Sequence, residues 1–63
     1  MNSADLIKRL KAAGFTEVSA KGSHHKLRNE SGKIVIVPHP KRDLPIGTVR
    51  AIFSQAGLDW SKR

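Results

Sequence analysis

Residues 15–37 decide the fold, and they read FTEVSAKGSHHKLRNESGKIVIV. Three runs of strand-forming residues alternate with two short turns, the strands at 15–21, 24–28 and 33–37 and the turns at 22–23 and 29–32. Connections this short join antiparallel strands, because a parallel pair needs a crossover of about a dozen residues or more. The stretch therefore predicts a three-stranded antiparallel sheet.

One amphipathic helix is predicted before these strands in the sequence, and another is predicted after them. Ser3 suits a helix N-cap and Gly14 suits a helix end, which bounds a first helix at about residues 4–13. Pro45 suits the first turn of a second helix, and Gly57 ends it. Both segments repeat apolar residues at helical spacing, namely Leu6, Ile7, Leu10 and Ala13, then Val49, Ile52, Phe53 and Ala56.

The order α-β-β-β-α indicates an α+β fold in which both helices cover one face of the sheet and leave the other face open to solvent. We expect one domain, residues 1–63, with Trp60 covering an edge of the core. A chain of 63 residues with 38% apolar side chains builds only a modest core. This excludes a doubly wound cofactor-binding sheet, a barrel and an enzyme with a deep enclosed pocket.

The chain has no cysteine, which excludes disulfides and thiolate metal sites. The longest apolar run, residues 34–37, is far too short to span a membrane, and residues 1–20 hold no signal-peptide hydrophobic region. We therefore expect a soluble, cytoplasmic protein with no membrane partner.

Positive charge is concentrated in the middle of the chain. The net charge is +7, with 12 Lys and Arg against five Asp and Glu. Residues 21–42 hold six of the cations, one carboxylate and all three histidines. This excess predicts a polyanionic partner that meets the middle segment. The alternative is a basic surface that is merely solvated.

Alternation along the second strand assigns its side chains to two faces. Leu27 is the only aliphatic residue of that strand, so it should face the core, and His25 shares its parity. His25 should then lie toward the helices or the sheet rim. The open face receives His24, Lys26 and Arg28.

His24 is thus a candidate acid or base beside two cations. A free histidine titrates near pH 6.5, so both protonation states are accessible at neutrality. RNA supplies its own nucleophile, the 2′-hydroxyl, so one histidine and a few cations could support cleavage without a metal or another cofactor. The alternative is a surface histidine with no role. His39, between two prolines, is a candidate second acid or base, or it orders its loop.

The remaining candidate residues are those expected to contact RNA. Ser23 either shapes the turn or offers its amide, with that of Gly22, to a phosphate. The full expected set is Gly22, Ser23, Lys26, Arg28, Lys41 and Arg42. The basic segment contains no aromatic residue, so no platform for base stacking is expected. Three histidines without cysteine or paired carboxylates do not favour a metal site.

Four segments in order resemble the HicA family of mRNA interferase toxins: Gly22-Ser23-His24-His25, Val37-Pro38-His39-Pro40, residues 43–50 (DLPIGTVR) and Gln55-Ala56-Gly57-Leu58. The resemblance covers nearly the whole chain. It implies a double-stranded-RNA-binding-domain-like fold and a ribosome-independent endoribonuclease that cleaves mRNA. It also implies a HicB-type antitoxin that neutralises the toxin.

The resemblance further implies that the histidine directly after Gly-Ser, His24, is catalytic, with Gly22 matching the family's glycine beside it. The chain departs from the family pattern at Leu27 and Phe15, where the family often has an aromatic residue and tryptophan, and its tail after Leu58 is short.

Two other classes of function remain. A non-catalytic RNA-binding module of the same fold explains the basic segment equally well, because a fold does not fix an activity. Such a module does not need His24. A partner-binding scaffold would leave the concentration of cations unexplained. We expect the free chain to be a monomer.

Overall fold

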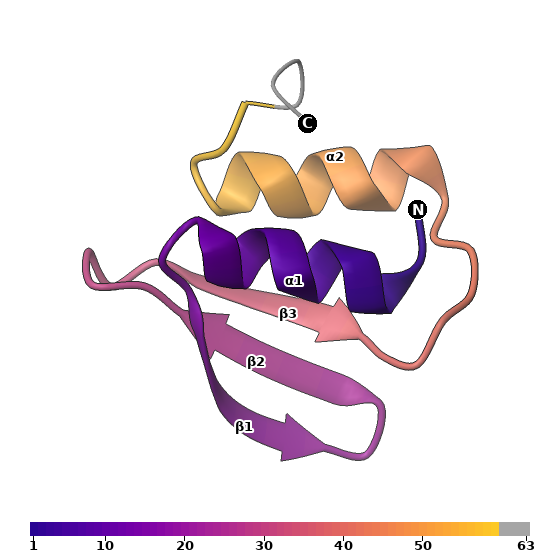
Figure 1. Cartoon of the computed structure of the whole chain (residues 1–63), viewed down its shortest axis with the longest axis horizontal. Helices are drawn as coiled ribbons and strands as arrows, with labels where there is room; N and C mark the ends of the chain where they lie inside the picture. The colour runs from indigo at the N-terminus through magenta and orange to yellow at the C-terminus, as the bar shows by residue number, and fades with distance from the viewer. Residues whose placement is uncertain (60–63) are drawn as a thin grey trace.

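The computed structural model describes residues 1–59. The elements are α1 (Ser3–Ala12), β1 (Thr16–Lys21), β2 (His24–Arg28), β3 (Ile34–Pro38) and α2 (Ile46–Gln55), shown in Figure 1. The predicted α-β-β-β-α order is confirmed. The expected position of Trp60 falls outside the described residues. Within residues 1–59, no helix combines the length and the apolar character needed to cross a bilayer.

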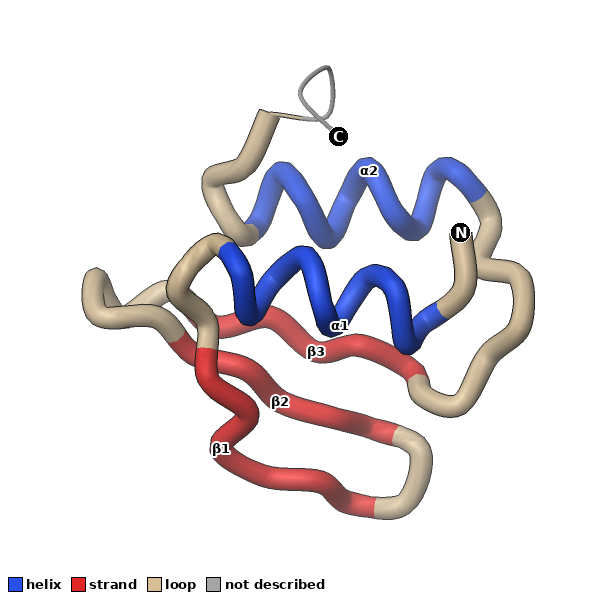
Figure 2. Tube along the Cα trace, in the orientation of Figure 1, coloured by secondary structure: helices blue, strands red, loops and turns tan. Residues whose placement is uncertain are grey.

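The sheet is an antiparallel meander in the order β1-β2-β3. Figure 2 shows α1 in front of β3, with α2 beside it. Both helices contact β3, while β1 is contacted by α1 and lies farthest from α2. The helices therefore cover the β3 side of the sheet, and β1 extends beyond them.

One apolar core joins the covered sheet face to the two helices. The sheet contributes Leu27, Val35 and Val37, all of them fully buried. The helices and their flanking loops contribute Leu6, Ile7, Leu10, Phe15, Leu44, Val49, Ile52, Phe53 and Ala56. In β3 the alternate residues Ile34 and Ile36 are exposed. This alternation confirms that one face of the sheet is covered and the other is open.

The helix ends differ in detail from the prediction. Asn2, and not Ser3, caps α1, and its side-chain oxygen accepts a hydrogen bond from the backbone N–H of Asp5 at 2.8 Å. Ser3 is the first residue of the helix, and its hydroxyl bonds elsewhere. Pro45 occupies the N-cap of α2, one position before the first turn. The expectation for the end of α2 is confirmed, because Gly57 has a φ of +74° and ends the helix.

Strand β1 contains a β-bulge at Val18, between Glu17 and Ser19. Glu17 pairs with Leu27, but Ser19 pairs with Lys26, so the extra residue reverses the alternation of side chains along β1. No residue of β1 is buried. The bulge thus decides which β1 side chains share the open face with β2.

Candidate nucleic-acid interface

The open face of the sheet is built from rows of residues that are paired across the strands. His24 pairs with Lys21 on one side and with Pro38 on the other, while Lys26 pairs with Ser19 and Ile36. Side chains of directly paired residues stand on the same face, about 5 Å apart. The β-bulge therefore brings Lys21 and Ser19 beside the two β2 residues that alternation had assigned to this face.

These side chains enclose a hollow of about 410 Å³, lined by Ser19, Lys21, His24, Lys26 and Ile36. His24 is exposed, with Lys21 opposite it on β1 and Lys26 two residues farther along β2. Ile36 is 48% exposed and adds an apolar wall. An anionic group with an attached apolar ring would fit this combination of charge and surface.

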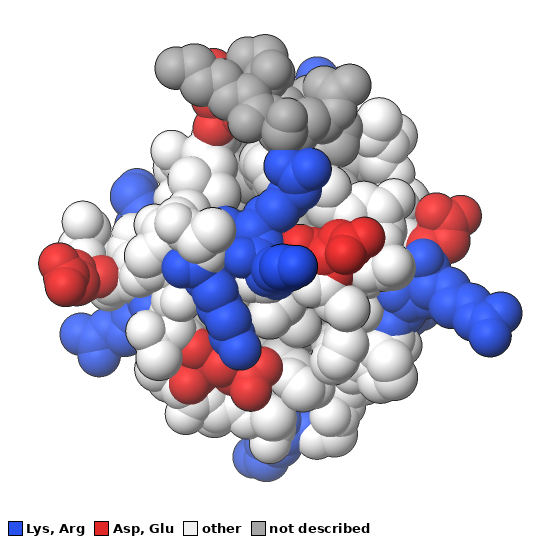
Figure 3. All heavy atoms as spheres, viewed as in Figure 1, with Lys and Arg blue, Asp and Glu red and all other residues white. Residues whose placement is uncertain are grey.

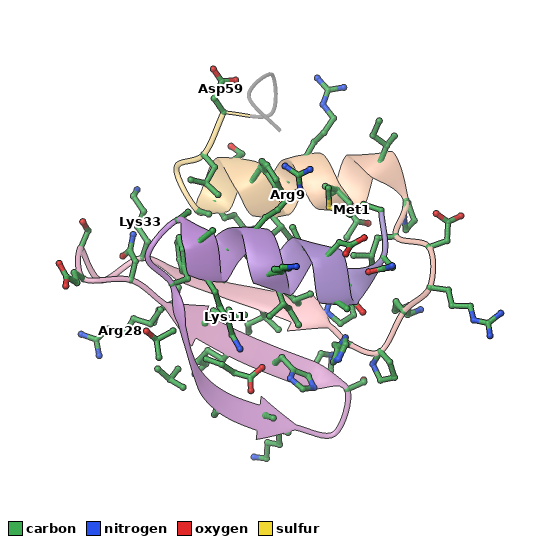
Figure 4. The ribbon with its side chains drawn as sticks, in the orientation of Figure 1. Met1, Arg9, Lys11, Arg28, Lys33 and Asp59 are labelled. Atoms are coloured by element: carbon green, nitrogen blue, oxygen red, sulfur yellow. The ribbon has the colours of Figure 1, made fainter. Side chains whose placement is uncertain are left out.

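Arg28 shares the open face but lies away from the hollow. Four residues of extended strand, about 13 Å, separate it from His24. Figure 4 shows its side chain at the end of the sheet opposite the β1–β2 turn. There it lines a separate hollow with Thr16, Val18 and Glu30. Any RNA contact it makes is therefore remote from His24.

The turn between β1 and β2 is formed by Gly22 and Ser23. Gly22 has a φ of +59°, which the first central position of a two-residue type II′ turn requires and which glycine adopts without strain. The backbone oxygen of Ser23 accepts a hydrogen bond from the backbone N–H of His39 at 2.8 Å. The turn that precedes His24 is thus joined to the segment that follows β3.

Lys41 and Arg42 lie in that segment, beside the start of α1. Together with Ser3 and His39 they line a hollow that does not include His24. The side chain of His39 follows the inward parity of Val35 and Val37 along β3. The structure therefore separates the candidates into an open-face group around His24 and a second group around the N-terminal end of α1.

His25 lies on the inner side of the sheet, as alternation predicts. Its side chain is 18% exposed, and its Nδ1–H donates a hydrogen bond to Glu17 Oε1 at 2.9 Å. Its ring also meets the ring of His39 edge to face, with 4.9 Å between centroids and 89° between planes. Adjacent histidines thus have different surroundings, because His24 faces solvent and His25 is held by two partners.

The hydrogen bond from His25 lowers the pKa of Glu17 below its ordinary value of 4.5. Burial raises this pKa to a smaller extent, and electrostatic interactions with His25, Lys11 and His39 add to the lowering. Figure 4 shows the Lys11 side chain extending from α1 toward the strands. Glu17 therefore stays ionised and keeps its partner in place at neutral pH.

The two faces of the molecule differ in charge. The view in Figure 3 shows the side that carries the helices, where Lys and Arg lie among Asp and Glu. On the open face, the described strand residues include Lys21, Lys26 and Arg28 and no carboxylate. Over residues 1–59, no three His, Asp or Glu side chains gather closely enough to hold a metal ion.

Sequence reasoning missed Lys21, Ser19 and Ile36 as members of this group. Lys21 was visible only as part of the basic segment, and nothing in the order of residues 16–21 marks the bulge that turns it to the open face. Ile36 was visible as an apolar strand residue with the parity of the open face. That parity was the one signal that could have found it.

A comparison with curated proteins gives no match. A comparison with family models matches residues 3–58 to the family described as "HicA toxin of bacterial toxin-antitoxin". The matched segment runs from the first residue of α1 to the residue after Gly57, and so it includes both helices, the whole sheet and the hollow around His24. The chain belongs to the HicA toxin family of bacterial toxin–antitoxin systems.

Proposed function

We propose that this toxin is a metal-independent endoribonuclease that cleaves mRNA with His24 as its general acid and base. One observation carries the proposal: His24 lies exposed beside Lys21 and Lys26 in a hollow of the uncovered sheet face. Membership of a toxin family adds a reason for such an activity, because cleavage of mRNA would stop translation and growth.

The proposed reaction uses the nucleophile that RNA carries. The 2′-oxygen attacks the adjacent phosphorus, the bond from phosphorus to the 5′-oxygen breaks, and a 2′,3′-cyclic phosphate and a 5′-hydroxyl form. A neutral His24 accepts the 2′-hydroxyl proton, and the resulting imidazolium returns a proton to the leaving 5′-oxygen. Lys21 and Lys26 offset the charge that builds on the phosphorane-like transition state.

We further propose that the substrate is single-stranded RNA held mainly by its phosphates. Lys26 neutralises the scissile phosphate, and Arg28 neutralises another phosphate farther along β2. At the turn, Gly22 and Ser23 offer their backbone amides to a phosphate. Lys41 and Arg42, in the loop after β3, add positive charge at the same end of the molecule (Figure 1). Ile36 offers apolar contact to a base or a ribose.

Toxin–antitoxin membership implies a neutralising partner. We propose a HicB-type antitoxin that binds the open face. An uncovered catalytic face cannot be inactivated by the toxin's own fold, so its control requires occlusion or distortion by another chain. We propose that the toxin and the antitoxin act in the cytoplasm, where mRNA is found. We also propose that the free toxin is a monomer.

The test is cleavage of a defined RNA by purified toxin in EDTA. His24→Ala is expected to lower the cleavage rate by about 10²–10⁴-fold, the usual contribution of general acid–base catalysis. Thermal melts and RNA binding should match those of the wild type, because the exposed imidazole contributes little to packing. Lys8→Ala, an exposed change on the other side of the molecule, is the matched control and should cleave normally.

Full activity of a folded His24→Ala variant would refute the role of this histidine. RNA binding with no cleavage by the wild type would instead favour the second candidate, a non-catalytic RNA-binding module. Activity that EDTA removes and a divalent cation restores would refute metal independence.

A further inference from the structure

Four side chains form a connected group on the inner side of the sheet, each from a different part of the chain. These are Ser3 at the start of α1, Glu17 in β1, His25 in β2 and His39 just after β3. We call them the inner-face cluster. Figure 1 shows that the start of α1, the β1–β2 turn and the loop after β3 lie at one end of the molecule. The cluster is therefore found at the end that carries His24.

Ser3 holds one side of the cluster. It is 1% exposed, and its Oγ lies 2.6 Å from His39 Nδ1. The backbone N–H of Lys41 donates to this oxygen at 2.8 Å, which leaves the single hydroxyl hydrogen for either His39 Nδ1 or the Lys41 carbonyl oxygen at 3.2 Å. The hydroxyl can therefore accept from a protonated His39 or donate to a neutral one, and it keeps the ring in place in both states.

Backbone bonds reinforce this side. The N–H of Ser3 donates to the Lys41 carbonyl at 2.9 Å, and the N–H of Leu44 donates to the Met1 carbonyl at 2.9 Å. The start of the chain and the loop after β3 therefore form one unit, and His39 has a fixed place within it.

The cluster reaches His24 through both of its chain neighbours. Ser23, directly before it, accepts a hydrogen bond from the His39 N–H at 2.8 Å. His25, directly after it, is held by Glu17 at 2.9 Å and by the His39 ring. His24 itself makes neither contact and faces the open side.

Such support matters because packing provides little of it here. Strand β1 extends beyond the helices and has no buried residue, and the one fully buried residue of β2, Leu27, lies three positions from His24. A catalytic side chain must be held within about 0.5 Å of its productive position. In addition to the pairing of β2 with β1 and β3, hydrogen bonds to residues 23 and 25 hold the chain on either side of His24.

We propose that Ser3, His39 and Glu17 are positioning residues for His24, with Ser3 and His39 acting through Ser23 and Glu17 acting through His25. The imidazole of His39 then serves as a hydrogen-bonding support and not as a second acid or base. This inference rests on the proposed function, because it assigns the cluster to the group that cleaves RNA.

His39→Asn and His39→Ala distinguish the two roles. Asparagine can place a polar atom near the position of Nδ1 and so keep the bond to Ser3, but it cannot transfer a proton at neutral pH. His39→Ala should lower kcat by roughly 10–100-fold with little change in KM, since misplacement by about 1 Å can cost 10²-fold. His39→Asn should recover most of that loss. A folded His39→Asn that is as inactive as His39→Ala would overturn the proposal and place His39 in the chemistry.

Amide hydrogen exchange gives a readout that does not require activity. The His39 N–H that bonds to Ser23 should exchange slowly in the wild type, faster in Ser3→Ala and His39→Ala, and slowly again in His39→Asn. Ser54→Ala, an exposed change on α2, is the control and should leave the exchange unchanged. Unchanged exchange in Ser3→Ala and His39→Ala would overturn the positioning role even if RNA is cleaved. A wild type that does not cleave RNA would refute the proposed function, and the exchange rates would still decide the positioning role.

Discussion

Lys26 and Arg28 carry the same charge on the same strand face, but only Lys26 lines the hollow with His24. We expect replacement of either residue by alanine to weaken RNA binding and to flatten the slope of log K against log salt by about 0.7, as for one lost phosphate contact with a single strand. Lys26→Ala should also slow cleavage of bound RNA, whereas Arg28→Ala should leave that step unchanged. Binding titrations over a range of salt and single-turnover cleavage measure the two effects.

Lys8→Ala removes the same charge from α1 and serves as the control for net charge. If the slope stays at its wild-type value in both strand variants, the RNA lies on a different surface.

Glu17 gives the fold a pH-dependent contribution. Its pKa is lowered in the folded state, mainly by the hydrogen bond from His25, so its ionised form stabilises the fold. That contribution is complete above the ordinary value of 4.5 and is lost as the pH falls through the lowered pKa. We expect Glu17→Gln to be less stable than the wild type at pH 7, and the difference to be smaller at pH 2. Urea unfolding at both pH values measures this, and a difference of the same size at pH 2 would contradict it.

For single residues, the sequence predicted which face of the sheet a side chain occupies but not its hydrogen bonds to residues far along the chain. The parity of Leu27 was enough to separate His24 from His25, because alternation is local. The bond between Ser3 and His39 joins residues 36 positions apart, so no local pattern contains it. Ser3 was assigned to the N-cap for its residue type, but Asn2 fills that place and leaves the Ser3 hydroxyl for His39 and Lys41.

Among the elements, β1 was the hardest to predict in detail. Its existence followed from its residue types, but strict alternation from Glu17 would turn Lys21 inward. The bulge at Val18 turns Lys21 outward, beside His24. A bulge depends on how one strand fits its neighbour, and the sequence of β1 alone does not specify it. The helices were predictable because each carries an apolar stripe of helical period, and β3 was predictable because it is a short run of β-branched residues between turn formers and prolines.

The end of α2 permits a matched pair of substitutions. Gly57 has a φ of +74°, and an added Cβ would lie 3.1 Å from Cε of Lys33. We expect Gly57→Ala to lower the free energy of unfolding by roughly 1–2 kcal/mol, the cost of a left-handed conformation for an L-residue. Gly47, in the same helix, has no atom within 4 Å of such a Cβ and no positive φ. Gly47→Ala should therefore raise stability by about 0.4–1 kcal/mol.

Chemical denaturation of both variants tests this expectation. Equal effects of the two substitutions would show that backbone conformation at Gly57 is not what ends α2.

The whole molecule has an uncovered sheet face with cations and a helix face with mixed charge (Figure 3). We expect the antitoxin to cover the open face with acidic side chains and to approach His24, because complementary charge speeds association and fixes orientation. Hydrogen-exchange protection in the complex should concentrate in residues 21–42 and leave the outer surface of α2 unchanged. Equal exposure of residues 21–42 in the free and bound toxin would contradict this.

The order of elements and the choice of covered face were predictable for the whole chain, because turn lengths and apolar periods determine them. How much of that face the helices cover was not predictable. It depends on where the helices settle across the sheet, which is a matter of three-dimensional packing, and they settle over β3 and leave β1 beyond them.

The position of β1 beyond the helices affects how the molecule responds to warming. Segments with few buried contacts open at a lower free-energy cost than the rest of a protein, and β1 has no buried residue to resist such opening. Detachment of β1 alone would remove Lys21 and Glu17 from the surroundings of His24 while β2, β3 and both helices stay folded. The proposed catalysis would then fail on warming before the molecule melts, and it would return on cooling without any refolding of the core.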